Sequence, residues 1–331
     1  MSNRKNDHIE LAFQSQTSRD TLDNRFYYEP LLSGHPTEGL NPLTFLGKTF
    51  RAPLWVSSMT GGTDSALKIN QNLARACNEF GFGMGLGSCR SILSDNEHFA
   101  DFDMRNIIGD DLPLFANLGI SQIEQLVGNN KTTEIEELVK RLRADGLIVH
   151  VNPLQEWFQP EGDIIKHPPI NTIKRLLDKV HFPVIVKEVG QGMGPASLRE
   201  LLKLPLEAVE FAAFGGTNFA AIERLRDQKS DIHLLEPFSK IGMDAYEMLE
   251  FVNQIVDREC EIQCKQLIIS GGINSYLDGY YLLQKSQLHA IYGQAWAFLK
   301  YAREDYEQLR QYVAAQVKGL AMAYAYLRIK S

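Results

Sequence analysis

The sequence has no uninterrupted apolar run long enough to cross a membrane and no strongly basic stretch. A transmembrane helix needs about 20 consecutive, mostly apolar residues, so no membrane-spanning segment is predicted. With 34 Lys and Arg residues against 41 Asp and Glu residues, the formal net charge is -7. That balance argues against nucleic acid or an anionic membrane as a partner. It does not exclude an anionic small ligand, because local basic groups decide such binding.

Cysteine is also scarce, with four in 331 residues: Cys77, Cys89, Cys260 and Cys264. That number is too small for a disulfide framework in a chain of this length. Cys260 and Cys264 have the i,i+4 spacing of a helix face, but no second ligand pair or histidine lies nearby. Packing thiols are therefore favoured over a zinc site. The first residues are polar and lack an apolar core, so we expect no signal peptide and a reduced, cytoplasmic protein.

The remaining composition, 44% hydrophobic and 23% charged, is that of an ordinary globular protein. Short β-type runs alternate with helical stretches along the chain, and no repeat stands out. The predicted strands are 54–58, 82–86, 114–117, 147–151, 184–187, 208–212, 267–270 and 290–292. The predicted helices are 69–80, 133–144, 170–179, 196–202, 245–257 and 277–283, with a further helical pattern at 304–327.

Eight strands separated by helices predict an α/β fold of the (β/α)8 TIM-barrel type. A doubly wound open sheet would show the same alternation. The barrel is preferred because polar or glycine-rich residues follow nearly every strand, as a ring of active-face loops requires. We expect a single domain over residues 1–331, in which residues 1–45 form an N-terminal arm or cap. The C-terminal helix is expected to pack on the barrel or on a neighbouring subunit.

The segment after the fourth predicted strand carries the most informative polar residues. The short apolar run Gly146-Leu147-Ile148-Val149, which predicts a buried strand, leads into His150-Val151-Asn152-Pro153-Leu154-Gln155-Glu156. Asn-Pro ends the strand, and an imidazole, two amides and a carboxylate follow in close succession. Functional groups held at a strand end by a rigid scaffold are typical of barrel active sites.

Glycine-rich segments follow several other strands, among them Ser270-Gly271-Gly272-Ile273 and Tyr292-Gly293-Gln294-Ala295. Loops after the last two strands of a barrel commonly bind phosphate. Each segment alone is as well explained by a structural turn. Their occurrence at successive strand ends favours a ring of ligand contacts. Lys187 ends the fifth strand, where its ammonium group meets either solvent or an anion.

Together these motifs resemble the FMN-dependent type 2 isopentenyl-diphosphate delta-isomerases over roughly residues 4–300. The resemblance rests on six elements, of which the Asn152 segment is nearly diagnostic. They are Arg4-Lys5-x-Asp7-His8, Met59-Thr60-Gly61-Gly62, Gly87-Ser88-x-Arg90, Ala116-Asn117-Leu118-Gly119, His150-x-Asn152-Pro153-Leu154-Gln155-Glu156 with Gln159-Pro160-Glu161-Gly162-Asp163, and Val186-Lys187-Glu188-Val189-Gly190.

The resemblance implies a barrel that holds one FMN and Mg2+, uses NADPH as reductant, and converts isopentenyl diphosphate to dimethylallyl diphosphate. It also implies a homo-oligomer, a tetramer or an octamer. The implied FMN contacts are Met59, Thr60, Gly61, Ser88, Asn117, Lys187, Thr217, Gly271, Gly272, Ile273, Ala295 and Trp296. The implied substrate contacts are Arg4, Lys5, His8, Ser88, Arg90, Asn152 and Gln155. Glu156 would hold Mg2+, and Gln155, Lys187 and His150 would be the catalytic residues.

These roles agree with the chemistry of the residue types. Arg90 can offer a diphosphate a bidentate fork, while Arg4 and Lys5 can close over it from the arm. One carboxylate suffices for Mg2+ when phosphates and waters complete the octahedron. Gln155 is neutral and no strong base stands in its segment. The resemblance therefore implies that the flavin takes part in proton transfer, with Gln155 orienting or relaying.

The chain departs from the family pattern at four positions. Ala212 replaces a serine, Cys89 a glutamine and Asn274 an arginine, while Trp296 interrupts the usual end of the eighth strand. Two other functions are open. One is an FMN-dependent 2-hydroxy-acid oxidoreductase, but such enzymes place a histidine base after a late strand and residues 264–274 contain none. The other is a non-enzymatic barrel that binds flavin or phosphate.

Overall fold

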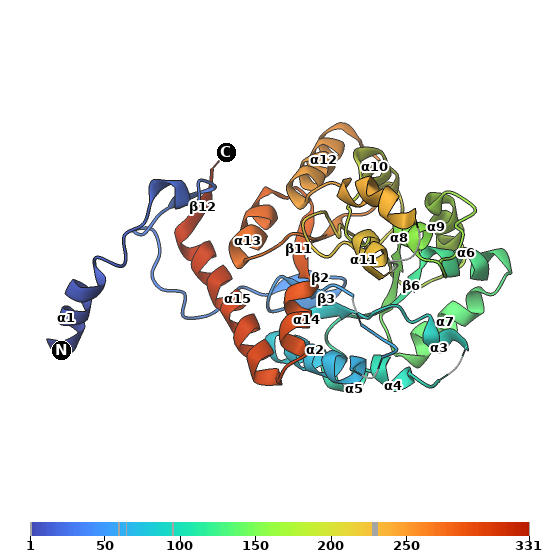
Figure 1. Cartoon of the computed structure of the whole chain (residues 1–331), viewed down its shortest axis with the longest axis horizontal. Helices are drawn as coiled ribbons and strands as arrows, with labels where there is room; N and C mark the ends of the chain where they lie inside the picture. Colours follow the sequence, from blue (N-terminus) through green and yellow to red (C-terminus); the bar gives the residue numbers. More distant parts are fainter. Residues whose placement is uncertain (1, 59, 64, 95, 227–230, 331) are drawn as a thin grey trace.

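The fold is a closed barrel of eight parallel strands inside a layer of helices (Figure 1). The computed structural model describes residues 2–58, 60–63, 65–94, 96–226 and 231–330. Around the barrel the order is β10-β11-β4-β5-β6-β7-β8-β9, and β9 closes it against β10. The strands are β4 (Leu54–Val56), β5 (Gly83–Gly85), β6 (Leu114–Gly119), β7 (Gly146–His150), β8 (Val184–Lys187), β9 (Ala208–Glu210), β10 (Gln266–Ser270) and β11 (His289–Gln294). The predicted TIM barrel and all eight of its strands are confirmed.

The strands β6, β7 and β8 show why the barrel could be predicted. Almost every residue in them is buried, on both faces of the strand. Parallel strands covered on both faces are continuously apolar rather than alternating. The predicted strand 208–212 is shorter in the structure, because Ala212 adopts a left-handed conformation with φ 44°.

Helices cover the outside of the barrel. Those that the sequence predicted are α2 (Ala66–Phe80), α7 (Thr132–Arg141), α9 (Pro169–Leu177), α10 (Pro195–Leu202), α12 (Ala245–Arg258), α13 (Tyr276–Lys285) and α15 (Tyr306–Tyr326). Those that it missed are α3 (Ser91–Ser94), α4 (Phe99–Phe102), α5 (Arg105–Ile108), α6 (Ile120–Gly128), α8 (Pro153–Phe158), α11 (Phe219–Arg226), α14 (Trp296–Ala302) and the 3-10 helix η2 (Asp231–Lys240). None of the helices in the described ranges is both long and apolar enough to span a bilayer.

A hairpin of β2 (Leu43–Phe45) and β3 (Lys48–Phe50) closes the amino end of the barrel. Phe45 and Phe50 are fully buried. Phe45 packs edge-on against His289 at the start of β11, and Lys48 pairs with Asp145 just before β7 at 2.6 Å. Because this end is plugged, a ligand site is left to the carboxyl ends of the strands.

The N-terminal segment forms an arm that stands off the barrel (Figure 1). It contains α1 (Ser2–Leu11), the 3-10 turn η1 (Arg19–Thr21) and β1 (Phe26–Tyr28). β1 pairs antiparallel with β12 (Leu327–Ile329) at the C-terminus, and α15 packs on the helix layer beside α13, α14 and α2. In Figure 1, α1 lies beyond α15, at the far left.

Candidate active site

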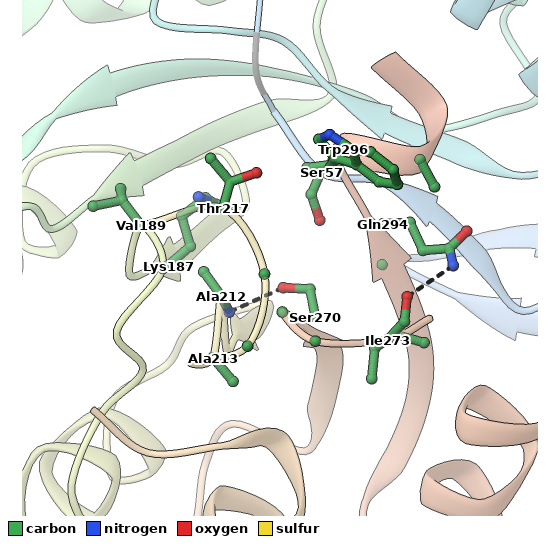
Figure 2. Close-up of a pocket in the computed structure, with 18 of the residues that line it drawn as sticks. Ser57, Lys187, Val189, Ala212, Ala213, Thr217, Ser270, Ile273, Gln294 and Trp296 are labelled. Atoms are coloured by element: carbon green, nitrogen blue, oxygen red, sulfur yellow. Dashed lines mark hydrogen bonds between the residues drawn. The ribbon is translucent and has the colours of Figure 1, made fainter. Parts of the chain in front are cut away.

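A cavity of about 370 Å³ opens at the carboxyl ends of β4, β8, β10 and β11 and under the loop after β9. This volume falls in the ~300–1,000 Å³ range of small-molecule sites. The structure brings seven of the residues predicted to contact FMN into its lining: Lys187, Thr217, Gly271, Gly272, Ile273, Ala295 and Trp296. Figure 2 shows Lys187 and Thr217 on one side of the cavity and Trp296 on the other.

Glycine backbone forms the floor of this cavity because side chains would not fit there. Gly271 has φ +89°, and a Cβ atom on it would lie 2.1 Å from the carbonyl oxygen of Ala213. Gly272 has φ +70°. Gln294 anchors the loop that follows, since its Nε2 donates to the carbonyl of Ile273 at 3.0 Å and its Oε1 accepts from the hydroxyl of Tyr312 on α15 at 2.8 Å. The glycine segment is therefore a close-fitting cradle as well as a turn.

Lys187 places a buried cation in the cavity wall. Its side chain is only 5% exposed. Its Nζ donates to the carbonyl of Glu188 at 2.8 Å. No acidic side chain among the described residues forms an ion pair with it, so its charge is available to an anionic or electron-rich ligand in the cavity.

Glu210, at the end of β9, is a buried carboxylate that the sequence analysis missed. It is fully buried, and its Oε1 accepts from the hydroxyls of Ser57 at 2.5 Å and Ser270 at 3.1 Å. The hydroxyl oxygen of Ser270 in turn accepts from the backbone N–H of Ala212 at 2.9 Å (Figure 2). Oε2 of Glu210 has no partner among the described residues. The carboxylate thus ties two serines of the cavity wall together and stabilises the left-handed turn at Ala212.

A second set of polar residues follows β7, the strand that pairs with β8. It consists of Asn152, Gln155 and Glu156, at the start of helix α8 and within it, and is called the α8 group. Gln155 is held at both ends of its amide. Its Oε1 accepts from Nδ2 of Asn152 at 3.1 Å, and its Nε2 donates to Oε1 of Glu223 at 3.1 Å. Glu223 lies on α11, is 3% exposed, and also accepts from Gln159 at 2.7 Å and from Arg226 at 2.5 Å.

Glu223 corrects the sequence analysis on one point. The segment around Gln155 holds no strong base, but the fold supplies a buried carboxylate in direct contact with the Gln155 amide. The only sequence signal for it was an acidic residue one helical turn after the buried Ala220. A carboxylate on the buried face of a helix needs partners, and Gln155, Gln159 and Arg226 provide them.

Glu156 lies on the side of α8 that is turned away from solvent, and it is 8% exposed. Its Oε1 accepts from Nδ2 of Asn152 at 3.1 Å and from the hydroxyl of Ser121 at 3.4 Å, and its Oε2 accepts from the backbone N–H of Asp163 at 2.8 Å. The side chain of Asp163 forms an ion pair with Arg90 at 3.1 Å. The structure therefore brings Asn152, Gln155, Glu156 and Arg90 together.

His150, at the end of β7, lies next to the cavity wall, because it is the partner of Lys187 in the register of β7 and β8. Its Nδ1 lies 2.8 Å from Oδ1 of Asn117, whose amide nitrogen donates to the carbonyl of Leu86. Nδ1 must then carry the proton, and Nε2 is an acceptor. Burial, reinforced by the charge of Lys187, lowers the pKa of His150 to about 3. The imidazole is neutral at neutral pH and cannot serve there as a cationic acid.

The lowered pKa of His150 should make the free energy of unfolding depend on pH. The unfolded chain binds a proton on His150 below pH about 6.5, whereas the folded protein does so only near pH 3. Across that window the unfolded state holds more protons, so stability falls as the pH falls. We expect His150→Gln to reduce the loss of unfolding free energy between pH 6.5 and 4, measured by urea denaturation. The exposed His181, changed to glutamine, is the control, and an unchanged slope in His150→Gln would contradict the assignment.

Other predicted contacts lie outside the cavity lining. Thr60 donates to Oδ1 of Asn70 at 2.6 Å, and Gly61 packs against Phe102. Ser88 is exposed on the loop after β5, and Asn117 is buried beneath His150. Met59 lies outside the described residues. FMN contacts by these five residues stay predictions.

The structure does not bring Arg4, Lys5 and His8 to the site. All three are exposed on α1, which lies beyond α15 and away from the barrel (Figure 1). Among the described residues no group of three or more His, Cys, Asp or Glu side chains is placed to hold a metal ion. Any metal bound at Glu156 must therefore take most of its ligands from elsewhere.

Proteins of known function resemble the chain over most of its length. The isopentenyl-diphosphate delta-isomerase of Rickettsia rickettsii (strain Sheila Smith) is 34% identical over 305 residues, which cover 90% of this chain and 85% of the relative. That of Rickettsia felis is 33% identical over 323 residues, covering 96% of this chain and 90% of the relative. The chain belongs to the isopentenyl-diphosphate delta-isomerase family. A scan against protein-family models found none that matches.

Solved structures show that the fold of this chain is shared more widely. A flavocytochrome b2 variant with sulfite bound matches with a TM-score of 0.61 at 13% identity, covering 95% of this chain and 77% of the other. A mandelate oxidase variant with a monooxide FMN adduct matches with a TM-score of 0.56 at 13% identity, covering 92% and 88%. At this identity the likeness supports the barrel fold alone.

Proposed function

We propose that the protein is an FMN-dependent type 2 isomerase that converts isopentenyl diphosphate to dimethylallyl diphosphate. The observation that carries the proposal is the position of Gln155. Its amide is hydrogen-bonded to Asn152 and Glu223, and it follows β7, the strand next to β8, whose Lys187 lines the cavity. The reaction adds a proton to the carbon at one end of the double bond. It removes a proton from the carbon attached to the other end, so that the double bond moves by one position. It therefore needs a proton donor, a proton acceptor and a site for a diphosphate.

The cavity suits FMN by its residues. Its glycine floor lets backbone N–H groups approach a phosphate, and Lys187 supplies a cation for the ring or the phosphate. The hydroxyl of Ser58 in the cavity wall is buried and has no partner among the described residues, as expected of a group that awaits a ligand. Bound flavin would supply a reducible ring able to exchange protons, with NADPH as its expected reductant.

The substrate would lie against the α8 group, with its diphosphate toward Arg90. Gln155 would orient the alkene, and Glu223 would hold the Gln155 amide and accept or return a proton through it. Neutral His150 would keep Asn117 and the end of β7 in place. Arg4, Lys5 and His8 lie on α1, beyond α15 and away from the barrel (Figure 1). They would contact the substrate only if α1 left this position and closed over the site. We further propose a homo-oligomer, a tetramer or an octamer, in the cytoplasm.

Mg2+ would bind at Glu156. The carboxylate and the buried Oδ1 of Asn152, which has no partner among the described residues, are the hard oxygen donors that Mg2+ prefers. Phosphate oxygens and waters would complete the coordination. The ion would neutralise the diphosphate while Arg90 anchors it.

Glu156→Gln is expected to raise the Mg2+ concentration for half-maximal activity by about 10–100-fold or more, the loss found even for groups that only orient metal ligands. The amide keeps the side chain's shape but loses its charge. The measurement is isomerase rate against Mg2+ concentration. Glu137→Gln, at an exposed position on α7, is the control. Identical Mg2+ curves for Glu156→Gln and the wild type would remove Glu156 as a ligand.

The proposed activity is tested on the purified full-length chain. A yellow protein with flavin absorption bands, and dimethylallyl diphosphate formed only after reduction by NADPH or dithionite, would support it. Formation of that product without flavin would exclude the FMN-dependent type. Turnover of lactate or mandelate with flavin reduction would support the hydroxy-acid oxidoreductase instead. Flavin binding with neither reaction would favour a non-enzymatic barrel.

A further inference from the structure

A second cavity of about 640 Å³ lies outside the barrel wall, among α8, α9 and α10. Its lining is mainly apolar and comes from all three helices and from the loops after β8 and η2. Within it Ile173, Leu201 and Met193 are buried. Its volume and composition are those of a ligand site rather than a packing defect.

The two cavities share the end of β8 as a wall. Successive residues of a strand point to opposite faces. Lys187 and Val189 line the first cavity, whereas Val186 and Glu188 line the second. The second cavity is thus separate from the proposed flavin site.

Glu188 gives this apolar cavity one polar anchor. The residue is 8% exposed. Its Oε2 accepts three backbone N–H groups, from Gly190 at 2.7 Å, Gln191 at 2.6 Å and Gly192 at 3.0 Å. Its Oε1 accepts no hydrogen bond from the described residues. This atom is nevertheless absent from the set of fully buried polar atoms that lack a partner, so it keeps some accessible surface. The free oxygen therefore faces the cavity that Glu188 lines.

The charge of the lining decides what can bind. Among the described residues that line the cavity, Glu188 and Glu200 alone are ionisable, and both are acidic. Glu200 pairs with Lys174 at 3.2 Å, whereas Glu188 forms no ion pair with any described residue. Burial raises the pKa of Glu188, against the three backbone N–H groups and the charge of Lys187. A donor on its free oxygen would relieve that cost, whereas an anion would add to it.

We propose that this outer cavity is a second ligand site for a small apolar molecule with one hydrogen-bond donor, either a hydroxyl or an ammonium group. The donor binds Oε1 of Glu188, and the hydrocarbon body packs against Ile173, Met193 and Met243. The proposal does not depend on the isomerase activity, because it concerns only the outer face of β8.

The probes are n-hexylamine, n-hexanol and hexanoate, which share a hydrocarbon body and differ in the head group. The full-length protein, labelled with 13C at its methionine methyl groups, is titrated with each and followed by NMR. The amine and the alcohol are expected to shift the signals of Met193 and Met243 in a saturable way, while that of the exposed Met322 on α15 stays in place. Tighter binding of the amine identifies an ammonium ligand, and tighter binding of the alcohol a hydroxyl ligand.

Two results would overturn the proposal. Hexanoate should bind at least about tenfold more weakly than the better donor, because it brings a second anion to Glu188. Equal binding of hexanoate would remove Glu188 as the anchor. Ala196→Trp fills the cavity from its exposed rim on α10 and should weaken binding at least tenfold. Its control is Ala315→Trp on the exposed face of α15. Wild-type binding by Ala196→Trp would place the probe elsewhere.

Discussion

Gln155→Asn is expected to lower isomerase kcat by about 10²–10⁴, the usual value of a positioned proton-transfer group. The shorter side chain withdraws the amide by roughly one C–C bond, ~1.5 Å. The contact with Glu223, now 3.1 Å, is then lost, and so is the one with Asn152. The KM for the diphosphate should change little, because Arg90 and the metal site are untouched.

Glu223→Gln separates the two roles that Gln155 could have. A glutamine at position 223 can still accept a hydrogen bond from Gln155, but it has no charge and no basicity. If Glu223 exchanges protons through Gln155, kcat falls by about 10²-fold or more. A wild-type rate in Glu223→Gln would leave Gln155 as an orienting group only. The control for Gln155→Asn is Gln311→Asn, which shortens an exposed glutamine on α15 by the same bond.

The barrel could be predicted because its strands are buried on both faces and therefore read as short apolar runs. Helix α8 could not, since Asn152-Pro153 indicates a chain break. In the structure Pro153 occupies the first turn of α8, where a missing N–H costs nothing. The consequence for the site is direct: α8 presents Gln155 and Glu156 from a rigid helix rather than from a loop.

The site itself was predictable only where its residues share strand ends. Lys187, His150 and Gly271 lie together because the carboxyl ends of parallel strands meet at one face of the barrel. Glu223 could not be found in the same way, because its contact with Gln155 spans 68 positions and depends on how α11 packs on α8. Glu210 follows two apolar residues, and nothing in the sequence shows that its carboxylate turns inward onto Ser57 and Ser270.

Lys187→Met is expected to lower kcat by about 10²–10³, as the loss of one preorganised electrostatic contact does. Methionine keeps most of the side-chain volume and removes the charge. It should also weaken FMN binding and make the midpoint potential of bound flavin more negative, because a nearby cation favours the reduced ring. Lys179→Met, which removes an exposed lysine at the end of α9, is the matched control and should change none of these quantities.

His150 offers a readout of Lys187 that needs neither cofactor nor substrate. The charge of Lys187 contributes, after burial, to the low pKa of His150. In Lys187→Met that pKa should rise from about 3 but stay below 6.5, since burial is unchanged. NMR titration of the imidazole measures the shift. An unmoved pKa would mean that the ammonium group lies too far from β7 to act on it. A loss of activity would then have to come from the cavity wall alone. A raised pKa together with lost turnover would instead show that one buried cation acts both on His150 at the end of β7 and in the cavity.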